Sequence, residues 1–267
     1  MTTPPPKPVI TLIGCGKMGG AMLRGWLKAE IAERIFVIEP SGLPDEFKND
    51  SQVTLTAALP SFDAFVLAVK PQMMNDICAA LHPAPGTLAL SIAAGTKIAN
   101  FENHFGAQHP IIRAMPNTPA AIARGITVAV ANPYVAPEQK ALADALLHSI
   151  GAVEWIEDES LMDAVTALSG SGPAYVFHLI EAMAEAGEAA GLPADFAMTL
   201  ARQTVIGSAA LAASEPETPA ATLRQNVTSP GGTTAAALGV LMDGGAMTEL
   251  FKKAIAKATA RSREMSQ

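Results

Sequence analysis

One segment near the end of the chain has the residues of an anion-binding turn. Thr228-Ser229-Pro230-Gly231-Gly232-Thr233-Thr234 runs straight into an apolar, helix-forming stretch at residues 235–238. Glycines let a backbone approach a ligand closely, and the first N–H groups of a helix have no partner inside it. Such a turn can therefore bind an anion, with two threonine hydroxyls beside the amides. The alternative is a helix that begins with capping threonines and binds nothing.

A second glycine-rich segment lies more than 200 residues upstream. Gly14-Cys15-Gly16-Lys17-Met18-Gly19 stands between a predicted strand and a predicted helix. In that context the spacing G-x-G-x-x-G is the fingerprint of dinucleotide binding. Gly14 permits the tight turn, Gly16 the close approach of a pyrophosphate, and Gly19 close packing of helix on strand. A glycine-rich turn without a ligand is the alternative.

Glu39 and Ser41, which follow the next predicted strand, bear on the choice of coenzyme. Glu39 lies where a carboxylate can bond the adenosine ribose diol, which disfavours a 2′-phosphate and favours NAD. Ser41 could instead donate to a phosphate, and no arginine stands beside it. Glu39 could also be a solvated loop residue. The preference between NADH and NADPH therefore stays open.

Two further candidates directly follow buried strands, where open α/β sheets bind ligands. Lys70, in Ala68-Val69-Lys70-Pro71, could face the coenzyme or only extend its ammonium group into water. The small residues Ala93-Ala94-Gly95 would let a flat ring or a ribose lie against the backbone. Ordinary close packing would explain them equally well.

The elements that must position these residues alternate along the first part of the chain. Near-continuous apolar runs are predicted as strands at residues 9–13, 35–38, 64–69, 87–92, 111–114, 126–130 and 153–156. Helices are predicted between them at residues 18–27, 72–81 and 137–150. This pattern is typical of a parallel sheet covered on both faces. The sequence thus predicts an α/β fold, with a Rossmann-like doubly wound domain over residues 9–158.

The pattern changes from about Glu159, and no convincing strand remains. Helices are predicted at residues 173–190, 193–213, 220–227, 234–242 and 246–263. Several are apolar nearly all round, which indicates burial on more than one side. The sequence therefore predicts an all-α C-terminal domain over residues 159–267 and favours a role for it in oligomerisation. A compact monomeric bundle would have a similar pattern.

Composition narrows the class of protein. The chain has 267 residues, of which 49% are hydrophobic and 16% charged, so it can bury one or two cores. A net charge of −7 without any Lys/Arg run argues against nucleic acid as a partner. The apolar runs are interrupted before the roughly 20 residues that a membrane span needs.

The N-terminus and the cysteines give the expected location. Residues 1–8 are proline-rich and lack the apolar core of a signal peptide, so they are predicted as a disordered arm. Cys15 and Cys78 are too few for a disulfide framework, and no Cys/His spacing suits a metal. A cytoplasmic protein without a metal site is expected.

In their order along the chain, these motifs resemble the pyrroline-5-carboxylate reductase family. The shared segments are residues 13–19, 68–72, 93–95, 113–119 (Arg-Ala-Met-Pro-Asn-Thr-Pro), 168–175 (Leu-Ser-Gly-Ser-Gly-Pro-Ala-Tyr) and 228–234. The resemblance covers nearly the whole chain beyond the arm, and the last three segments in this order are specific to the family. It implies the last step of proline biosynthesis, in which NADPH or NADH reduces 1-pyrroline-5-carboxylate to L-proline.

The resemblance also implies site residues. The predicted coenzyme contacts are Gly14, Cys15, Gly16, Lys17, Met18, Gly19, Glu39, Ser41, Val69, Lys70, Ala94, Asn117 and Asn226. Of these, Glu39 and Ser41 come from the argument about the ribose above, and the resemblance implies the others. The implied substrate site is Ser229, Gly231, Gly232, Thr233 and Thr234. The family's enzymes dimerise through the helical domain, with sites shared between two chains, and often assemble further. The match loosens at Glu39, where family members vary.

The expected mechanism uses the turn for orientation. Its amides can hold the substrate carboxylate without a buried arginine. Thr234 is expected to hydrogen-bond the ring nitrogen and so orient the imine carbon for hydride transfer. A threonine hydroxyl is a very weak acid, so solvent or prior protonation of the substrate is expected to supply the proton. His178 and Tyr175 are more simply explained as packed or interface residues.

Two other classes remain as alternatives. A β-hydroxyacid dehydrogenase-like or ketoacid reductase joins a similar domain to helices, but its chemistry usually needs a Lys or His acid beside the carbonyl. Neither Ser-Gly-Ser-Gly-Pro nor Thr-Ser-Pro-Gly-Gly contains such a residue. A non-catalytic nucleotide-binding regulator would not need the second anion-binding turn.

Overall fold

The computed structural model describes residues 6–265, which divide by their contacts into two units. The first unit contains the described residues up to Ser171 and again from Ala258, and the second contains residues 172–257. The domain boundary after residue 158 stays a prediction. Of the predicted arm, residues 1–5 lie outside the described residues, while the Pro8 carbonyl accepts a hydrogen bond from the Glu33 amide at 2.9 Å.

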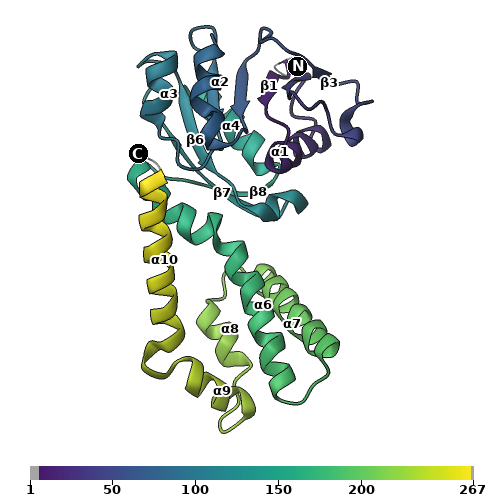
Figure 1. Ribbon diagram of the computed structural model, residues 1–267, viewed down its shortest axis with the longest axis vertical. Coiled ribbons are helices and arrows are strands. Elements are labelled where there is room, and N and C mark those ends of the chain that lie inside the picture. Colours follow the sequence, from purple (N-terminus) through teal and green to yellow (C-terminus); the bar gives the residue numbers. More distant parts are fainter. Residues whose placement is uncertain (1–5, 266–267) are drawn as a thin grey trace. The chain divides into compact units, whose positions relative to one another are not determined.

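The first unit is built on an eight-stranded sheet with the order β3-β2-β1-β4-β5-β6-β7-β8 (Figure 1). The strands are β1 (Val9–Ile13), β2 (Arg34–Ile38), β3 (Val53–Leu55), β4 (Ala64–Leu67), β5 (Leu88–Ser91), β6 (Ile111–Met115), β7 (Gly125–Ala131) and β8 (Gly151–Trp155). From β1 the chain adds strands first on one side and then, from β4, on the other. The doubly wound prediction is confirmed, and this reversal beside β1 is where such sheets bind ligands.

The last two strands correct the expectation of a parallel sheet. β7 pairs antiparallel with β6, and β8 pairs parallel with β7. The reason is the short connection between β6 and β7, residues 116–124, because a parallel crossover needs a dozen or more residues. This connection makes a 3-10 turn (Thr118–Ile122) and reverses at Ala123, whose φ is +55°.

Helices cover both faces of the sheet. α1 (Lys17–Lys28) and α4 (Pro137–His148) pack on one face, and α2 (Met74–Ala80) and α3 (Ile98–Phe105) pack on the other. Along β4, Ala64 and Val66 point to the first face, whereas Phe65 and Leu67 point to the second. Burial on both sides explains why this strand is apolar at every position.

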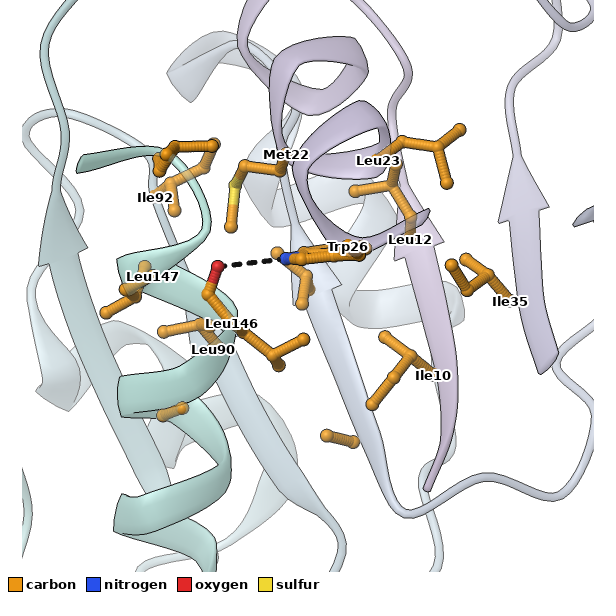
Figure 2. Packing of buried hydrophobic residues seen from close by; sticks show 14 of the residues in the cluster. Ile10, Leu12, Met22, Leu23, Trp26, Ile35, Leu90, Ile92, Leu146 and Leu147 are labelled. Atoms are coloured by element: carbon orange, nitrogen blue, oxygen red, sulfur yellow. Dashed lines mark hydrogen bonds between the residues drawn. The ribbon is translucent and has the colours of Figure 1, made fainter. Parts of the chain in front are cut away.

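The core beneath α1 and α4 also fixes these two helices to each other. Trp26 of α1 is fully buried among sheet residues such as Ile10 and Leu90, and its Nε1 donates to the Leu146 carbonyl at 3.0 Å (Figure 2). A buried indole N–H needs such a partner. The bond therefore sets the position of α1, and with it the glycine-rich loop from which α1 begins.

Several short elements are absent from the sequence-based prediction. β3 has three residues at the sheet edge, and α3 has only eight residues. Segments of this length carry too few residues for a periodicity to stand out. The same holds for α5 (Met162–Val165) and the π-helical turn Thr166–Gly170 that follows it.

The second unit is helical throughout its regular structure, as predicted. Its helices are α6 (Gly172–Ala189), α7 (Ala194–Ser214), α8 (Ala220–Asn226), α9 (Thr233–Leu241) and the first part of α10 (Ala246–Met265). α6 and α7 form a hairpin through small residues, since a Cβ on Gly187 would lie 3.1 Å from that of Ala197 (Figure 1).

This unit has almost no core of its own within one chain. The buried residues of 172–257 are three alanines, Ala184, Ala197 and Ala201. Large apolar side chains are exposed instead, among them Phe177 (60%), Val240 (74%) and Leu250 (67%). An apolar surface of this kind marks an interaction site.

No helix in the described part of the chain has the length and apolar character to cross a membrane. Among residues 6–265, no group of three or more His, Cys, Asp or Glu side chains is arranged to hold a metal ion.

Candidate active site

A cavity of about 760 Å³ opens where the carboxyl ends of β1, β2 and β4 meet. Five of the predicted coenzyme contacts line it: Gly14, Gly16, Glu39, Val69 and Lys70. The other predicted contacts of this unit do not line it; they are Cys15, Lys17, Met18, Gly19, Ser41, Ala94 and Asn117. The size is that of a small-molecule or cofactor site.

The three glycines of the loop have different roles. Gly14 has φ +93°, and a Cβ there would lie 2.7 Å from the Ala68 carbonyl oxygen. A Cβ on Gly19 would collide with the Gly14 carbonyl oxygen, so both positions need glycine to pack the loop against α1 and β4. A Cβ on Gly16 would meet nothing within 4 Å, because this residue faces the open cavity.

The start of α1 can hold the pyrophosphate of a dinucleotide. Gly16 is its N-cap and offers no side chain, and the first helical hydrogen bond runs from Gly20 N to Gly16 O at 2.7 Å. The amides of residues 17–19 therefore have no acceptor within the helix and suit a bound anion. An open space in front of Gly16 and unpaired helix amides beside it fit a nicotinamide dinucleotide.

Glu39 has an unexpected orientation. Its carboxylate accepts hydrogen bonds from Cys15 N (2.8 Å), Ser41 N (3.1 Å) and Ser41 Oγ (2.7 Å). Although partial burial on its own would raise it, these three bonds hold the pKa of Glu39 below its usual value. Glu39 is thus neither a freely solvated loop residue nor a general acid. Ser41 donates to this carboxylate through both its amide and its hydroxyl, and its contact with a coenzyme stays a prediction.

Neither cysteine has the properties of a nucleophile. Burial, followed by the nearby Glu39 and Glu46 carboxylates, raises the pKa of the Cys15 thiol to about 11. Burial alone raises the pKa of the Cys78 thiol to about 11. Cys15 packs in the core beneath α1, so any coenzyme contact it makes is through its backbone.

Part of the cavity wall is missing from the sequence-based prediction. Ala57, Ala58 and Leu59 line it, as do Met73, Ile77 and other residues up to His82. The first group follows β3, and because that strand was not predicted, this loop was not placed beside the glycine-rich one. The apolar pair Val53 and Leu55, spaced by two, was the signal that could have found it.

Asn117 connects two segments of the first unit. Its Oδ1 accepts from Ile126 N at 3.0 Å, and its Nδ2 donates to the Ser169 carbonyl at 3.2 Å. Ser169 lies in the π-helical turn, which the bond from Ser171 N to Thr166 O (2.8 Å) closes. π-turns occur frequently at functional sites. A coenzyme contact by Asn117 stays a prediction, as does that of Asn226, which is exposed at the end of α8.

The predicted anion-binding turn has the backbone that its sequence requires. Gly232 N donates to Ser229 O at 3.0 Å, and Gly231 has φ +70°, which a type II turn needs at its third residue. α9 follows with Gly232 as its N-cap and no side-chain capping bond. The first helical bond is Ala236 N to Gly232 O at 3.1 Å, so the amides of residues 233–235 point beyond the helix.

The two threonines differ in their surroundings. Thr234 is half-buried and Thr233 is exposed. Because the N-cap is Gly232, neither hydroxyl caps α9, which removes the alternative of capping threonines. The turn can hold an anion, and its role as the substrate site stays a prediction.

A doubly wound domain with a glycine-rich loop, a coenzyme-sized cavity and a helical unit defines a nicotinamide-dependent oxidoreductase. The model of NADP oxidoreductases, coenzyme F420-dependent, matches residues 9–95, and that of pyrroline-5-carboxylate reductase dimerisation matches residues 159–265. The chain is 40% identical to a pyrroline-5-carboxylate reductase of Pseudomonas aeruginosa, over 97% of each chain. It therefore belongs to the pyrroline-5-carboxylate reductase family.

Solved structures agree with this assignment. The pyrroline-5-carboxylate reductase of Coxiella burnetii superposes with a TM-score of 0.90 at 38% identity, covering 97% of this chain and 98% of that one. The pyrroline carboxylate reductase of Plasmodium falciparum, solved with NADP bound, has a TM-score of 0.79 at 29% identity over the same shares. The resemblance stated from the motifs is confirmed.

Proposed function

We propose that this chain reduces 1-pyrroline-5-carboxylate to L-proline with NADPH or NADH, and that it works in the cytoplasm. The near-full-length identity to curated pyrroline-5-carboxylate reductases carries the proposal. Two features of the chain support it: a cavity at the glycine-rich loop for the dinucleotide, and a separate anion-binding turn for a small carboxylate. A nucleotide-binding regulator would have no use for the second feature.

The turn at residues 229–232 suits the substrate carboxylate. The amides of residues 233–235 supply donors at a helix N-terminus, where the helix dipole also favours an anion. No buried arginine is required, so the substrate binds without the desolvation of a second charged group.

Thr234 is the residue that we assign to the reacting part of the substrate. Its hydroxyl is not used for capping, and it can donate to or accept from the ring nitrogen while the amides hold the carboxylate. Bound nicotinamide supplies the hydride. The protein's own contribution is then orientation and modest polarisation of the imine, with the proton coming from solvent or from the already protonated substrate.

An assay with purified protein tests the proposal. Mixing the protein with NADPH or NADH and 1-pyrroline-5-carboxylate should oxidise the coenzyme, followed by loss of nicotinamide absorbance, and should form L-proline. A 2-ketoacid serves as the comparison substrate. Turnover of the ketoacid without turnover of the cyclic imine would contradict the assignment and favour a ketoacid reductase.

The exposed apolar face of the second unit predicts self-association through that unit. Phe177→Glu should weaken the dimer by at least about tenfold, because a carboxylate is costly to bury in an apolar contact. Light scattering across a dilution series measures the effect. Leu55→Glu, on the edge strand of the first unit and 47% exposed, is the matched control and should leave assembly unchanged. If Phe177→Glu and wild type dimerised with equal affinity, the dimer interface would not include Phe177.

A further inference from the structure

We propose that Glu39 is a coenzyme-specificity residue that makes this enzyme prefer NADH to NADPH, because its carboxylate already takes the hydrogen-bond donors that a 2′-phosphate would need. The inference rests on the proposed function only in taking a nicotinamide dinucleotide as the coenzyme. It goes further by naming which of the two the site is built for.

The position of Glu39 puts it at the adenosine ribose. It directly follows β2 and lines the cavity together with Gly14 and Gly16. In doubly wound domains the pyrophosphate lies on the helix that begins after β1, and the ribose hydroxyls reach the end of the neighbouring strand. A 2′-phosphate would therefore come next to the Glu39 carboxylate.

The donors at this place converge on a single carboxylate. Cys15 N, Ser41 N and Ser41 Oγ lie 2.8, 3.1 and 2.7 Å from the Glu39 oxygens. Backbone amides and a serine hydroxyl are the groups with which a protein would otherwise hold a phosphate ester. Glu39 thus occupies the phosphate's place as an internal anion.

Glu39 still has capacity for a ribose. A carboxylate has about four acceptor positions. The three bonds above leave room for a hydroxyl donor, so the 2′-hydroxyl of NADH can bind where a 2′-phosphate would be repelled.

Other charges at the cavity do not compensate for this repulsion. The cationic or titratable side chains that line it besides Glu39 are Lys70 and His82, and no arginine is among its lining residues. Lys70 follows β4, which is separated from β2 by β1 in the sheet. Arg24 is paired with Glu46 at 2.6 Å. A 2′-phosphate would thus meet a carboxylate with no arginine to pair with.

Family membership alone does not set this preference, because a relative was crystallised with NADP bound. The test is therefore made on this chain. Binding of NADH and of NADPH to the wild-type protein is measured by titration calorimetry, without any imine substrate. The 2′-phosphate is isolated with a second pair of probes, 5′-AMP and adenosine 2′,5′-bisphosphate.

NADH should bind wild type about 10- to 100-fold more tightly than NADPH, since like charges placed together are strongly unfavourable. Glu39→Ser removes the anion and frees the Ser41 and Cys15 donors, so the ratio should fall at least tenfold or reverse. Glu39→Gln removes the charge at nearly constant shape and should give an intermediate ratio. Glu33→Gln removes an exposed carboxylate that directly precedes β2, at the opposite end of the strand from Glu39, and should leave the ratio unchanged.

Three results would overturn the inference: wild type binding NADPH at least as tightly as NADH, a ratio in both Glu39 variants within twofold of wild type, or no binding of either coenzyme to wild type. If Glu39→Ser does not fold, two measurements test the inference in its place. They are the binding of 5′-AMP and adenosine 2′,5′-bisphosphate to wild type, and the NADH to NADPH ratio of Glu39→Gln. A clear NADH preference in a protein that does not reduce the cyclic imine would uphold this inference while the proposed substrate fails.

Discussion

Thr234→Val should lower kcat for reduction of 1-pyrroline-5-carboxylate by a factor of about 10 to 1,000. This is the range for losing one positioning or oxyanion-type donor. Valine keeps the size and branching of threonine and removes only the hydroxyl. KM for the substrate should change less than kcat, because the amides of residues 233–235 still hold the carboxylate. Steady-state kinetics with both substrates varied measures the two effects separately.

Two further variants make this result specific. Thr234→Ser restores a hydroxyl and should recover most of the lost turnover. Thr222→Val changes a threonine in the first turn of the neighbouring α8, where the side chain is exposed, and should have wild-type kinetics. Since no threonine caps α9, the melting temperature of Thr234→Val should stay close to that of wild type. Wild-type kcat in a folded Thr234→Val would remove this residue from the mechanism.

Gly16→Val should reduce kcat/KM for the coenzyme by a factor on the order of 100, a loss typical of a misplacement of about 1 Å. The valine side chain would project into the open space where the pyrophosphate is expected. The backbone of Gly16 has φ −69° and ψ −162°, which other residues adopt without strain. Thermal unfolding should therefore be nearly unchanged, while calorimetry shows weakened coenzyme binding.

Gly19→Ala is the matched comparison in the same loop. Its Cβ would collide with the Gly14 carbonyl, so we expect a loss of about 1–3 kcal/mol in stability. That corresponds to roughly 2–4 °C of melting temperature for each kcal/mol. If Gly16→Val were as destabilised as Gly19→Ala, Gly16 would be a packing glycine and the cavity in front of it would lose its assignment.

Most of the fold could be predicted because its main elements are long and strongly patterned. β4 is apolar at each position since both of its faces are covered, and α6 and α7 carry long helical runs. The predicted direction of β7 was wrong, because an apolar run has the same pattern in a parallel and in an antiparallel strand. The length of the 116–124 connection contained that information.

The candidate site, too, could be predicted only in part. Gly14, Gly16 and Gly19 could be named from spacing: Gly14 and Gly19 pack closely and Gly16 faces open space, while their contact with a coenzyme stays a prediction. The wall at residues 57–59 could not, because it follows a strand of three residues whose only signal is the pair Val53 and Leu55. The second unit showed its apolar character in the sequence, and the structure added that one chain leaves this surface exposed.

The sequence by itself determined the family and the backbone of the two glycine turns that we propose bind anions. Positive φ at Gly14 and Gly231 and unpaired amides at a helix start are local properties, which a few adjacent residues specify. Only the tertiary structure decided which donors remain available to a ligand. The bond from Cys15 N to Glu39 joins residues that are 24 positions apart, and it exists because β1 and β2 pair side by side in the sheet. The expected coenzyme preference depends on that pairing, because the donors beside the ribose are already used.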